Sequence, residues 1–296
     1  MSGSTDLTRA AHLRNLEDEE IGTRYRILNY YLPLFRDFCK SRGLDPSQVR
    51  VLDCGCGGGA SVTFLADAGF EAVGIDIAQF RREQWKERAR LPGGTFVQAD
   101  AVNLPFVNES FDIVLSSGML EHIGVAEVYA PKYRATPVAD QAERRRNFLA
   151  ECLRVLRPRG VLYVDHPNGS FPVDFWHSDY RSRPRWHWPG EKFLPSFMEV
   201  WRLAKSVYPN CIVQPISPAG RFTFRRSQRR WYGQLFTAPM ELFFRLLRHR
   251  PFARLAGSPM NPYLVIRIAR AHELIASAAG YGAAQRIAEA VENYSK

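Results

Sequence analysis

Between residues 50 and 165, short apolar segments alternate with stretches of helical periodicity, and this alternation restricts the chain to few folds. Five of the apolar segments predict β-strands, because each is short and bounded by Gly, Pro or Asp. They are Arg50–Cys54, Glu71–Ile77, Thr95–Ala99, Phe111–Ser116 and Gly160–Asp165, with helices expected at Ala60–Ala68, Gln79–Arg90 and Arg146–Leu156. The pattern predicts an α/β fold: a doubly wound, mostly parallel sheet with helices on both faces.

The rest of the 296-residue chain is arranged around this core, residues 49–168. Helical spacing over Leu28–Cys39, with a kink expected at Pro33, predicts an N-terminal helical cap at 1–48. Residues 169–258 contain two insertions, 169–194 and 218–259, which flank a predicted helix (Pro195–Tyr208) and strand (Cys211–Ile216). Residues 259–296 add a final strand, Tyr263–Ala269, and an Ala-rich C-terminal helix. The prediction is therefore one domain with a seven-stranded sheet.

A glycine-rich turn, Asp53-Cys-Gly-Cys-Gly-Gly-Gly59, follows the first strand and leads into a helix. Glycines let the backbone approach a ligand, and the free N–H groups of the helix start attract negative groups. Asp76, about twenty residues later, can accept hydrogen bonds from both hydroxyls of a ribose. Gly55-x-Gly57-x-x-Ala60 also fits the dinucleotide fingerprint, so the glycines alone leave NAD open. The Asp53 carboxylate favours another ligand, because it would repel a pyrophosphate and attract a sulfonium or amino group.

With these features the chain resembles the class I S-adenosylmethionine-dependent methyltransferases, in particular the small-molecule branch that includes ubiquinone-type enzymes. The motifs that carry the resemblance are Asp53–Gly59, Val73–Ile77, Asp100 with Leu104–Phe106, Ser110–Asp112, Leu120–His122 and Cys152–Gly160. The resemblance implies S-adenosylmethionine as cofactor and a Rossmann-like methyltransferase sheet with cap insertions. It makes 49–168 the cofactor-binding core and 169–258 the acceptor-side region. Pro158-Arg159-Gly160 has one glycine fewer than the family often has there; that turn is structural, so cofactor binding is not put in doubt.

The resemblance also assigns cofactor contacts to individual residues. Asp53, Gly55 and Gly57 would line the methionine and ribose side of the cofactor, and Asp76 would hold the ribose hydroxyls with Ile77 beside the adenine. Asp100 and the backbone of Ala101 would meet the amine edge of the adenine. Ser117 or Gly118 would form the floor of the pocket.

Two histidines stand where a general base is expected. His122 follows the fourth predicted strand and His166 the fifth, at the carboxyl ends where open α/β sheets bind ligands. A neutral imidazole can take the proton of an acceptor hydroxyl. For His122 a role in shaping the pocket is equally compatible with the sequence, and for His166 the base is the lesser alternative. No carboxylate cluster suggests bound magnesium, so we expect no metal.

The positive charge of the chain lies in the acceptor-side region. Residues 181–270 hold seventeen Lys and Arg against three Glu, a net of +14, so the rest of the chain carries −4 of the total +10. Five of the six tryptophans lie between Trp176 and Trp231. Arginines among aromatic residues suit stacked bases, sugars beside phosphate, or an anionic membrane surface. We expect an anionic acceptor to contact Trp176, Trp186, Trp188 and Arg225.

The predicted function is methyl transfer to a hydroxyl, or to an activated carbon, of a small-molecule, glycan or lipid-linked acceptor. Motifs of amino-methylating and cytosine-C5 enzymes are absent, which narrows the acceptor to these classes. Two alternatives stay open: a tRNA or rRNA methyltransferase that uses the basic half, and a non-catalytic S-adenosylmethionine-binding or membrane-associated scaffold. Without an apolar leader or a bilayer-length apolar segment we expect a cytoplasmic protein. Its basic segment near 225–248, with a predicted apolar helix at Trp231–Leu247, would contact a membrane surface, a phosphate or the protein core.

Overall fold

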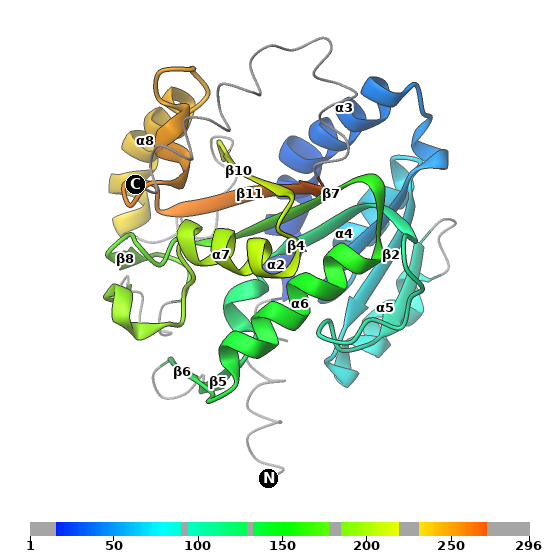
Figure 1. Ribbon diagram of the computed structural model, residues 1–296, viewed down its shortest axis with the longest axis horizontal. Coiled ribbons are helices and arrows are strands. Elements are labelled where there is room, and N and C mark those ends of the chain that lie inside the picture. The colour runs from blue at the N-terminus through cyan, green and yellow to red at the C-terminus, as the bar shows by residue number, and fades with distance from the viewer. Residues whose placement is uncertain (1–15, 90–93, 129–132, 178–184, 219–230, 271–296) are drawn as a thin grey trace.

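A computed structural model of the chain describes residues 16–89, 94–128, 133–177, 185–218 and 231–270 (Figure 1). Its main sheet consists of β1 (Arg50–Cys54), β2 (Glu71–Asp76), β3 (Gly94–Gln98), β4 (Phe111–Ser117), β7 (Leu156–Pro167), β10 (Cys211–Ile216) and β11 (Tyr263–Arg270). The strand order is β10-β11-β7-β4-β1-β2-β3, and β11 alone is antiparallel to its neighbours. The predicted α/β class and the mostly parallel, seven-stranded sheet are confirmed.

Helices cover both faces of this sheet, as the doubly wound prediction requires. On one face lie α6 (Gln141–Val155) and α7 (Phe197–Val207), which pack side by side (Figure 1). On the other lie the π-helical turn η1 (Ile27–Tyr31), α3 (Leu32–Arg42), α4 (Ala60–Asp67) and α5 (Arg82–Arg88). Adjacent residues of a strand point to opposite faces, so Leu52 packs in the first core and Val51 in the second, both fully buried.

The N-terminal segment reaches the sheet through an irregular helix. α2 (Leu16–Arg26) continues through η1 into α3, and Pro33 lies in the first turn of α3. In a regular helix the Pro33 ring would collide with the carbonyl four residues earlier, at Asn29. The π-helical turn directly before the proline gives that carbonyl another geometry, so the irregularity expected at Pro33 takes this form.

The first insertion contains regular structure that was not predicted from the sequence. Within 169–194 a short antiparallel pair, β8 (Val173–Asp174) and β9 (Arg185–Trp186), precedes the turn η5 (Pro189–Glu191). A second unpredicted hairpin joins β5 (Val125–Val128) to β6 (Arg134–Pro137). The later insertion contains the expected apolar helix, α8 (Trp231–Leu246), and then η8 (Ala253–Gly257). The C-terminal helix predicted from Glu273 lies outside the described residues.

Three short 3-10 turns complete the described elements: η2 (Pro46–Gln48), η3 (Gln79–Arg81) and η4 (Leu120–His122). In the described part of the chain, no helix is both long enough and apolar enough to cross a membrane. The carboxyl ends of β1, β2, β3, β4 and β7 lie along one edge of the parallel part of the sheet, and η4 follows β4 directly at that edge. The residues predicted for the cofactor and the chemistry lie on the strands and loops of this edge.

Candidate active site

The turn after β1 has a backbone that only glycine accommodates at two positions. Gly55 and Gly59 have φ of 80° and 84°, in the left-handed region that disfavours other residues. A Cβ on Gly55 would lie 2.7 Å from the sulfur of Met119, and one on Gly59 would collide with the Phe96 ring. The N–H groups of Gly55 and Cys56 both donate to the carbonyl of Ile75 at 2.9 Å, which holds the turn against β2.

Asp76 connects that turn to the end of β2. Its Oδ2 accepts from the Gly57 N–H at 3.0 Å and its Oδ1 from the Ala78 N–H at 2.8 Å. A carboxylate offers about four lone-pair sites, so two remain for other donors. The next residue, Ile77, has 64% of its surface exposed, which leaves its side chain open to a flat apolar group.

Asp53 lies at the end of β1 and is buried, with the Ser61 hydroxyl donating to its carboxylate. Burial raises the pKa of Asp53 to about 6, although the Ser61 hydrogen bond and the charge of Arg26 act in the opposite direction. The carboxylate is therefore mainly ionised at pH 7, in a place where a cationic ligand group would relieve the cost of its burial.

Three more residues predicted for the cofactor lie at strand ends: Asp100 and Ala101 follow β3, and Ser117 is the last residue of β4. Asp100 accepts from the Val102 N–H at 3.1 Å, and Ala101 is buried beside it. The Ser117 hydroxyl is buried without a hydrogen-bond partner, a state that polar groups in proteins rarely keep. An open glycine turn, three carboxylates at strand ends and this unpaired hydroxyl fit the polar ends of S-adenosylmethionine. The individual contacts assigned to these residues stay predictions.

His122, the first candidate base, lies in η4 and is paired with an acid. Its Nδ1 lies 2.9 Å from Oε1 of Glu127 on β5, and the Tyr133 hydroxyl donates to the same oxygen. Burial lowers the pKa of His122, but the hydrogen bond to Glu127 and the charges of Glu121 and Glu127 outweigh it and raise the pKa to about 9. An imidazolium has no free lone pair, so His122 can serve as a base only after it loses its proton.

His166, the second candidate, has the opposite environment at the end of β7. It is fully buried, and its Nδ1 lies 2.8 Å from the carbonyl of Pro167. A carbonyl only accepts, so Nδ1 carries the hydrogen and Nε2, which has no partner, keeps a lone pair. Burial lowers the pKa of His166 to about 4. Of the two histidines, His166 is therefore the neutral one at pH 7, and which of them takes a proton stays a prediction.

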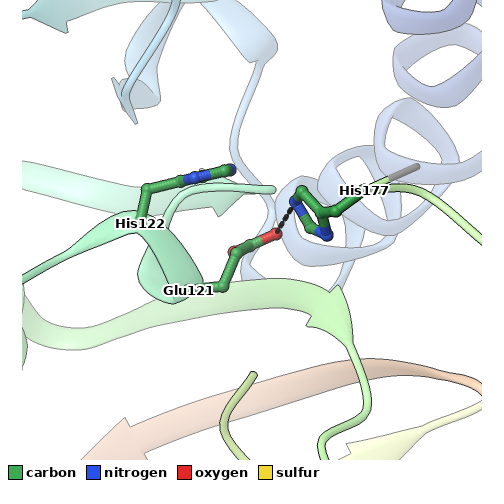
Figure 2. Close-up of side chains that lie close together, drawn as sticks. All are labelled: Glu121, His122 and His177. Atoms are coloured by element: carbon green, nitrogen blue, oxygen red, sulfur yellow. Dashed lines mark ion pairs between the residues drawn. The ribbon is translucent and has the colours of Figure 1, made fainter. Parts of the chain in front are cut away.

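A cluster around His122 was not anticipated. Glu121 is the other polar residue of η4, and His177 comes from the loop after β8; Figure 2 shows their side chains pointing toward each other. Glu121 Oε1 and His177 Nε2 are 3.9 Å apart, and His177 Nδ1 is 3.0 Å from Oδ2 of Asp174. In the sequence Glu121 was identified only as part of a motif, and neither His177 nor Asp174 was predicted to be a site residue. Their insertion has no periodicity from which the contact could have been predicted.

The residues predicted for the acceptor are scattered over the acceptor-side region. Trp176 is partly buried, with its ring centroid 4.7 Å from that of Tyr263. Trp186 and Trp188 are largely exposed, on and just after β9. Arg225 lies outside the described residues. The three described tryptophans that were predicted for the acceptor thus divide into one that packs on the sheet and two that face solvent.

Comparisons with known proteins identify the core. A family model described as "Methyltransferase domain" matches residues 52–164. The phthiotriol/phenolphthiotriol dimycocerosates methyltransferase of Mycobacterium tuberculosis is 37% identical over 143 residues, 48% of this chain and 45% of that protein. Its namesake from Mycobacterium leprae is 32% identical over 150 residues, 51% of this chain and 48% of that protein. The chain spans about half the length of the curated relatives it matches.

A solved structure extends the likeness of the fold beyond this core. A chain in the complex of the Haloferax volcanii Trm112 methyltransferase activator with a methyltransferase aligns with a TM-score of 0.50 and 17% identity. The alignment covers 90% of this chain and 96% of that one, and at this identity it shows the fold alone. The sheet and the domain match agree with the cofactor predicted from the sequence, S-adenosylmethionine. Residues 52–164 are therefore a class I S-adenosylmethionine-dependent methyltransferase domain.

Proposed function

We propose that the protein methylates a hydroxyl group of a lipid-linked acceptor at a membrane surface. The observation that carries this proposal is the exposed apolar stripe of α8 in the acceptor-side region. Relatives that share the core are named for phthiotriol and phenolphthiotriol dimycocerosates, which supports a lipid acceptor. Other acceptors, glycan or small molecule, have no comparable support.

The stripe consists of Leu235, Leu242 and Leu246, spaced seven and four residues apart and exposed on one side of α8. The opposite side, with Phe244 and the following Leu247, is buried against the body of the protein. A helix that needs only one apolar face for its own packing has no folding reason to expose a second.

Basic residues continue from the end of this helix. Arg245, Arg248, Arg250 and Arg254 are exposed, and the acidic Glu241 is their nearest counter-charge along the helix. Apolar side chains flanked by arginines are typical of helices that lie in the headgroup region of anionic membranes. Such a position would bring a lipid-linked acceptor to the exposed Trp186 and Trp188 on the same region of the chain.

The chemistry divides between the cofactor and the chain. When bound, S-adenosylmethionine supplies a methyl group already activated as a sulfonium. The residues of this protein would bind and orient the reactants: the glycine turn and Asp76 would hold the cofactor, and Asp53 would favour its cationic part. The chain also has to hold the acceptor hydroxyl in line with the methyl group and accept its proton, for which His166 has an available lone pair.

An assay with labelled S-adenosylmethionine and a lipid extract tests the proposal. We expect label in the lipid fraction that resists alkaline hydrolysis, as an ether does, and a product heavier by one methylene group. In Asp76→Asn, cofactor affinity should fall about tenfold or more, because hydrogen bonds to a charged carboxylate contribute roughly 1.5–3 kcal/mol each. The exposed Asp67→Asn serves as the matched control. Label in RNA or in polar metabolites, and none in lipid, would refute the lipid acceptor.

A further inference from the structure

The geometry points to a binding site for a divalent transition-metal cation, such as Zn²⁺, formed by Glu121, His122 and His177. Each side chain offers one ligand atom, and the three atoms lie within 4.8 Å of one another (Figure 2). Two imidazoles and one carboxylate are the donor set of many catalytic zinc sites and of other divalent transition metals. No metal was predicted from the sequence because no carboxylate cluster is present, whereas this donor set is mainly histidine.

Both histidines are oriented in the way that metal-bound histidines are. Nδ1 of His122 bonds to Glu127 at 2.9 Å, and Nδ1 of His177 bonds to Asp174 at 3.0 Å. A carboxylate that accepts from Nδ1–H fixes the tautomer and leaves the Nε2 lone pair free for a metal, and such carboxylate–histidine pairs recur around zinc. Asp174 is itself held by Arg185, whose Nη2 lies 3.1 Å from Oδ2.

Glu121 supplies an independent reason for a cation. Its side chain is almost fully buried, and its Oε2 has no hydrogen-bond partner in the described structure. Its other oxygen is 3.9 Å from His177 Nε2, too far for a hydrogen bond. The nearby guanidinium of Arg145 donates instead to the backbone carbonyls of Glu121 and Phe193. A buried carboxylate oxygen without a partner is costly, and a bound cation would remove that cost.

The cluster borders the cofactor turn. Met119, one residue before η4, packs against Gly55, where a Cβ would lie only 2.7 Å from the Met119 sulfur. A Cβ added to Gly118 would lie 4.0 Å from Glu121 Oε1. The side chain of His122 keeps about a third of its surface exposed, so three protein ligands would leave a position open on that side. A cation beside the methyl donor is therefore placed to bind an acceptor oxygen.

Its role rests on the proposed function. A divalent cation lowers the pKa of an oxygen that it binds. The acceptor hydroxyl would lose its proton to the general base of the proposed function, His166, its oxygen would form the new bond to the methyl carbon, and the carbon–sulfur bond would break with its electron pair remaining on sulfur. His122 would then act as a ligand rather than as the base.

Equilibrium dialysis of the untagged full-length protein against Zn²⁺, with metal analysis, tests the site. We expect about one Zn²⁺ per chain. Glu121→Gln and His177→Gln should weaken binding about a hundredfold or more, and Asp174→Asn by roughly 10–100-fold because it only positions His177. His249→Gln, which changes an exposed histidine outside the cluster, is the matched control and should bind Zn²⁺ as the wild type does.

Labelled S-adenosylmethionine binding, measured on the same preparations, shows that each variant is folded. Zn²⁺ should also raise the melting temperature of the wild type and of His249→Gln, but not that of Glu121→Gln. No Zn²⁺ in the wild type, or equal Zn²⁺ in Glu121→Gln and His177→Gln, would overturn the site. Zn²⁺ binding that depends on both residues supports the site even where no methylated lipid forms, a result that would count against the proposed function alone.

Discussion

Asp53 is buried, and its carboxylate is predicted from the sequence to attract a cationic ligand group. Burial raises its pKa to about 6 from an ordinary value near 3.8, so the folded protein binds a proton more readily than the unfolded chain between these values. The stability of the cofactor-free protein should therefore fall as pH rises from about 4 to 6, by roughly 3 kcal/mol at most. A cation bound beside Asp53 would reverse this penalty by favouring the ionised form.

Cofactor affinity should consequently depend on pH through Asp53. We expect S-adenosylmethionine affinity to decrease about tenfold per pH unit below pH 6, because binding then requires the carboxylate to lose a proton. Calorimetric titration between pH 5 and 8 measures this, and Asp53→Asn should bind weakly with little pH dependence. S-adenosylhomocysteine lacks the sulfonium charge and should show a smaller change. The same affinity for the wild type at pH 5 and pH 7.5 would contradict the role of Asp53.

At Gly59 the cost of a left-handed backbone can be separated from the cost of a steric clash. Gly59→Ala places a side chain at φ 84° and against the Phe96 ring, which cannot move freely because it stacks on Trp85 with centroids 5.6 Å apart. We expect a loss of about 2–4 kcal/mol in the free energy of unfolding, measured by urea denaturation. Gly69→Ala is the control, since φ is 92° and the nearest atom to its Cβ is Pro46 at 3.5 Å; it should lose about 1 kcal/mol. Equal losses would show that the steric contact is unimportant.

The sequence predicts where the cofactor-side candidates lie in the fold better than where the acceptor-side candidates lie. Asp53, Asp76 and Asp100 stand at strand ends that hydrophobic patterning locates, and parallel strands bring such ends to one edge of the sheet. His177 approaches Glu121 only because the insertion after β7 folds back across that edge. No local spacing encodes that contact, since it depends on tertiary packing of a segment without periodicity.

Among the elements, the main strands were predicted to within a few residues, and the short hairpins were missed. β4 was found because its centre, Ile113–Leu115, is apolar and the segment is short and bounded by turn residues. β5 and β6 have four residues each and mixed polarity, so their pairing depends on neighbours rather than on their own pattern. α6 begins at Gln141, five residues before the predicted start. The prediction missed this first turn because it is mainly polar, although Gln141 itself is buried.

The N-terminal helices are attached to the sheet by a buried polar cluster that no pattern indicated. The hydroxyls of Tyr31 in η1 and Tyr263 in β11 both donate to the carboxylate of Asp165 in β7. All three residues are buried, and burial together with the Asp165 charge raises the pKa of both tyrosines well above the ordinary value. The tyrosines therefore stay neutral donors, and one carboxylate links three elements that are distant in sequence.

Arg145 of α6 bonds to loops at the active-site edge, which allows a test. Arg145 is buried and donates to the carbonyls of Glu121, Lys192 and Phe193. Arg145→Met should reduce the free energy of unfolding by about 2–4 kcal/mol, because these carbonyls lose their charged donor in a buried place. Hydrogen exchange should accelerate in the segments around residues 120–127 and 190–195.

The neighbouring Arg146 is exposed and provides the matched control. Arg146→Met makes the same chemical change on the same helix but removes no buried contact. Its free energy of unfolding should therefore stay within about 0.5 kcal/mol of the wild-type value. If the two variants lost equal stability, the three carbonyl contacts of Arg145 could not be what joins α6 to the loops.

At the scale of the whole molecule, charge and exposed apolar surface coincide. The net +14 of residues 181–270 contrasts with −4 for the rest of the chain, and the exposed stripe of α8 lies inside the positive part. Charge alone is compatible with any polyanion, including RNA. An apolar stripe gains nothing from RNA phosphates, whereas it gains free energy in a headgroup region, so the coincidence favours an anionic membrane surface.

Vesicle binding separates the two contributions. We expect the protein to co-sediment with vesicles that contain anionic lipid and to bind neutral vesicles weakly, with release as salt rises from 0.1 M to 1 M and the Debye length falls from about 10 Å to 3 Å. Replacing both Leu235 and Leu242 by Gln should weaken binding about tenfold or more, because each leucine contributes roughly 1.5–3 kcal/mol when it is fully buried in an apolar phase. Val107→Gln changes an equally exposed apolar residue in the turn before β4 and should leave binding unchanged. Binding that salt abolishes but the leucine replacements do not affect would mean that arginines alone make the contact, and α8 would then need another explanation for its exposed stripe.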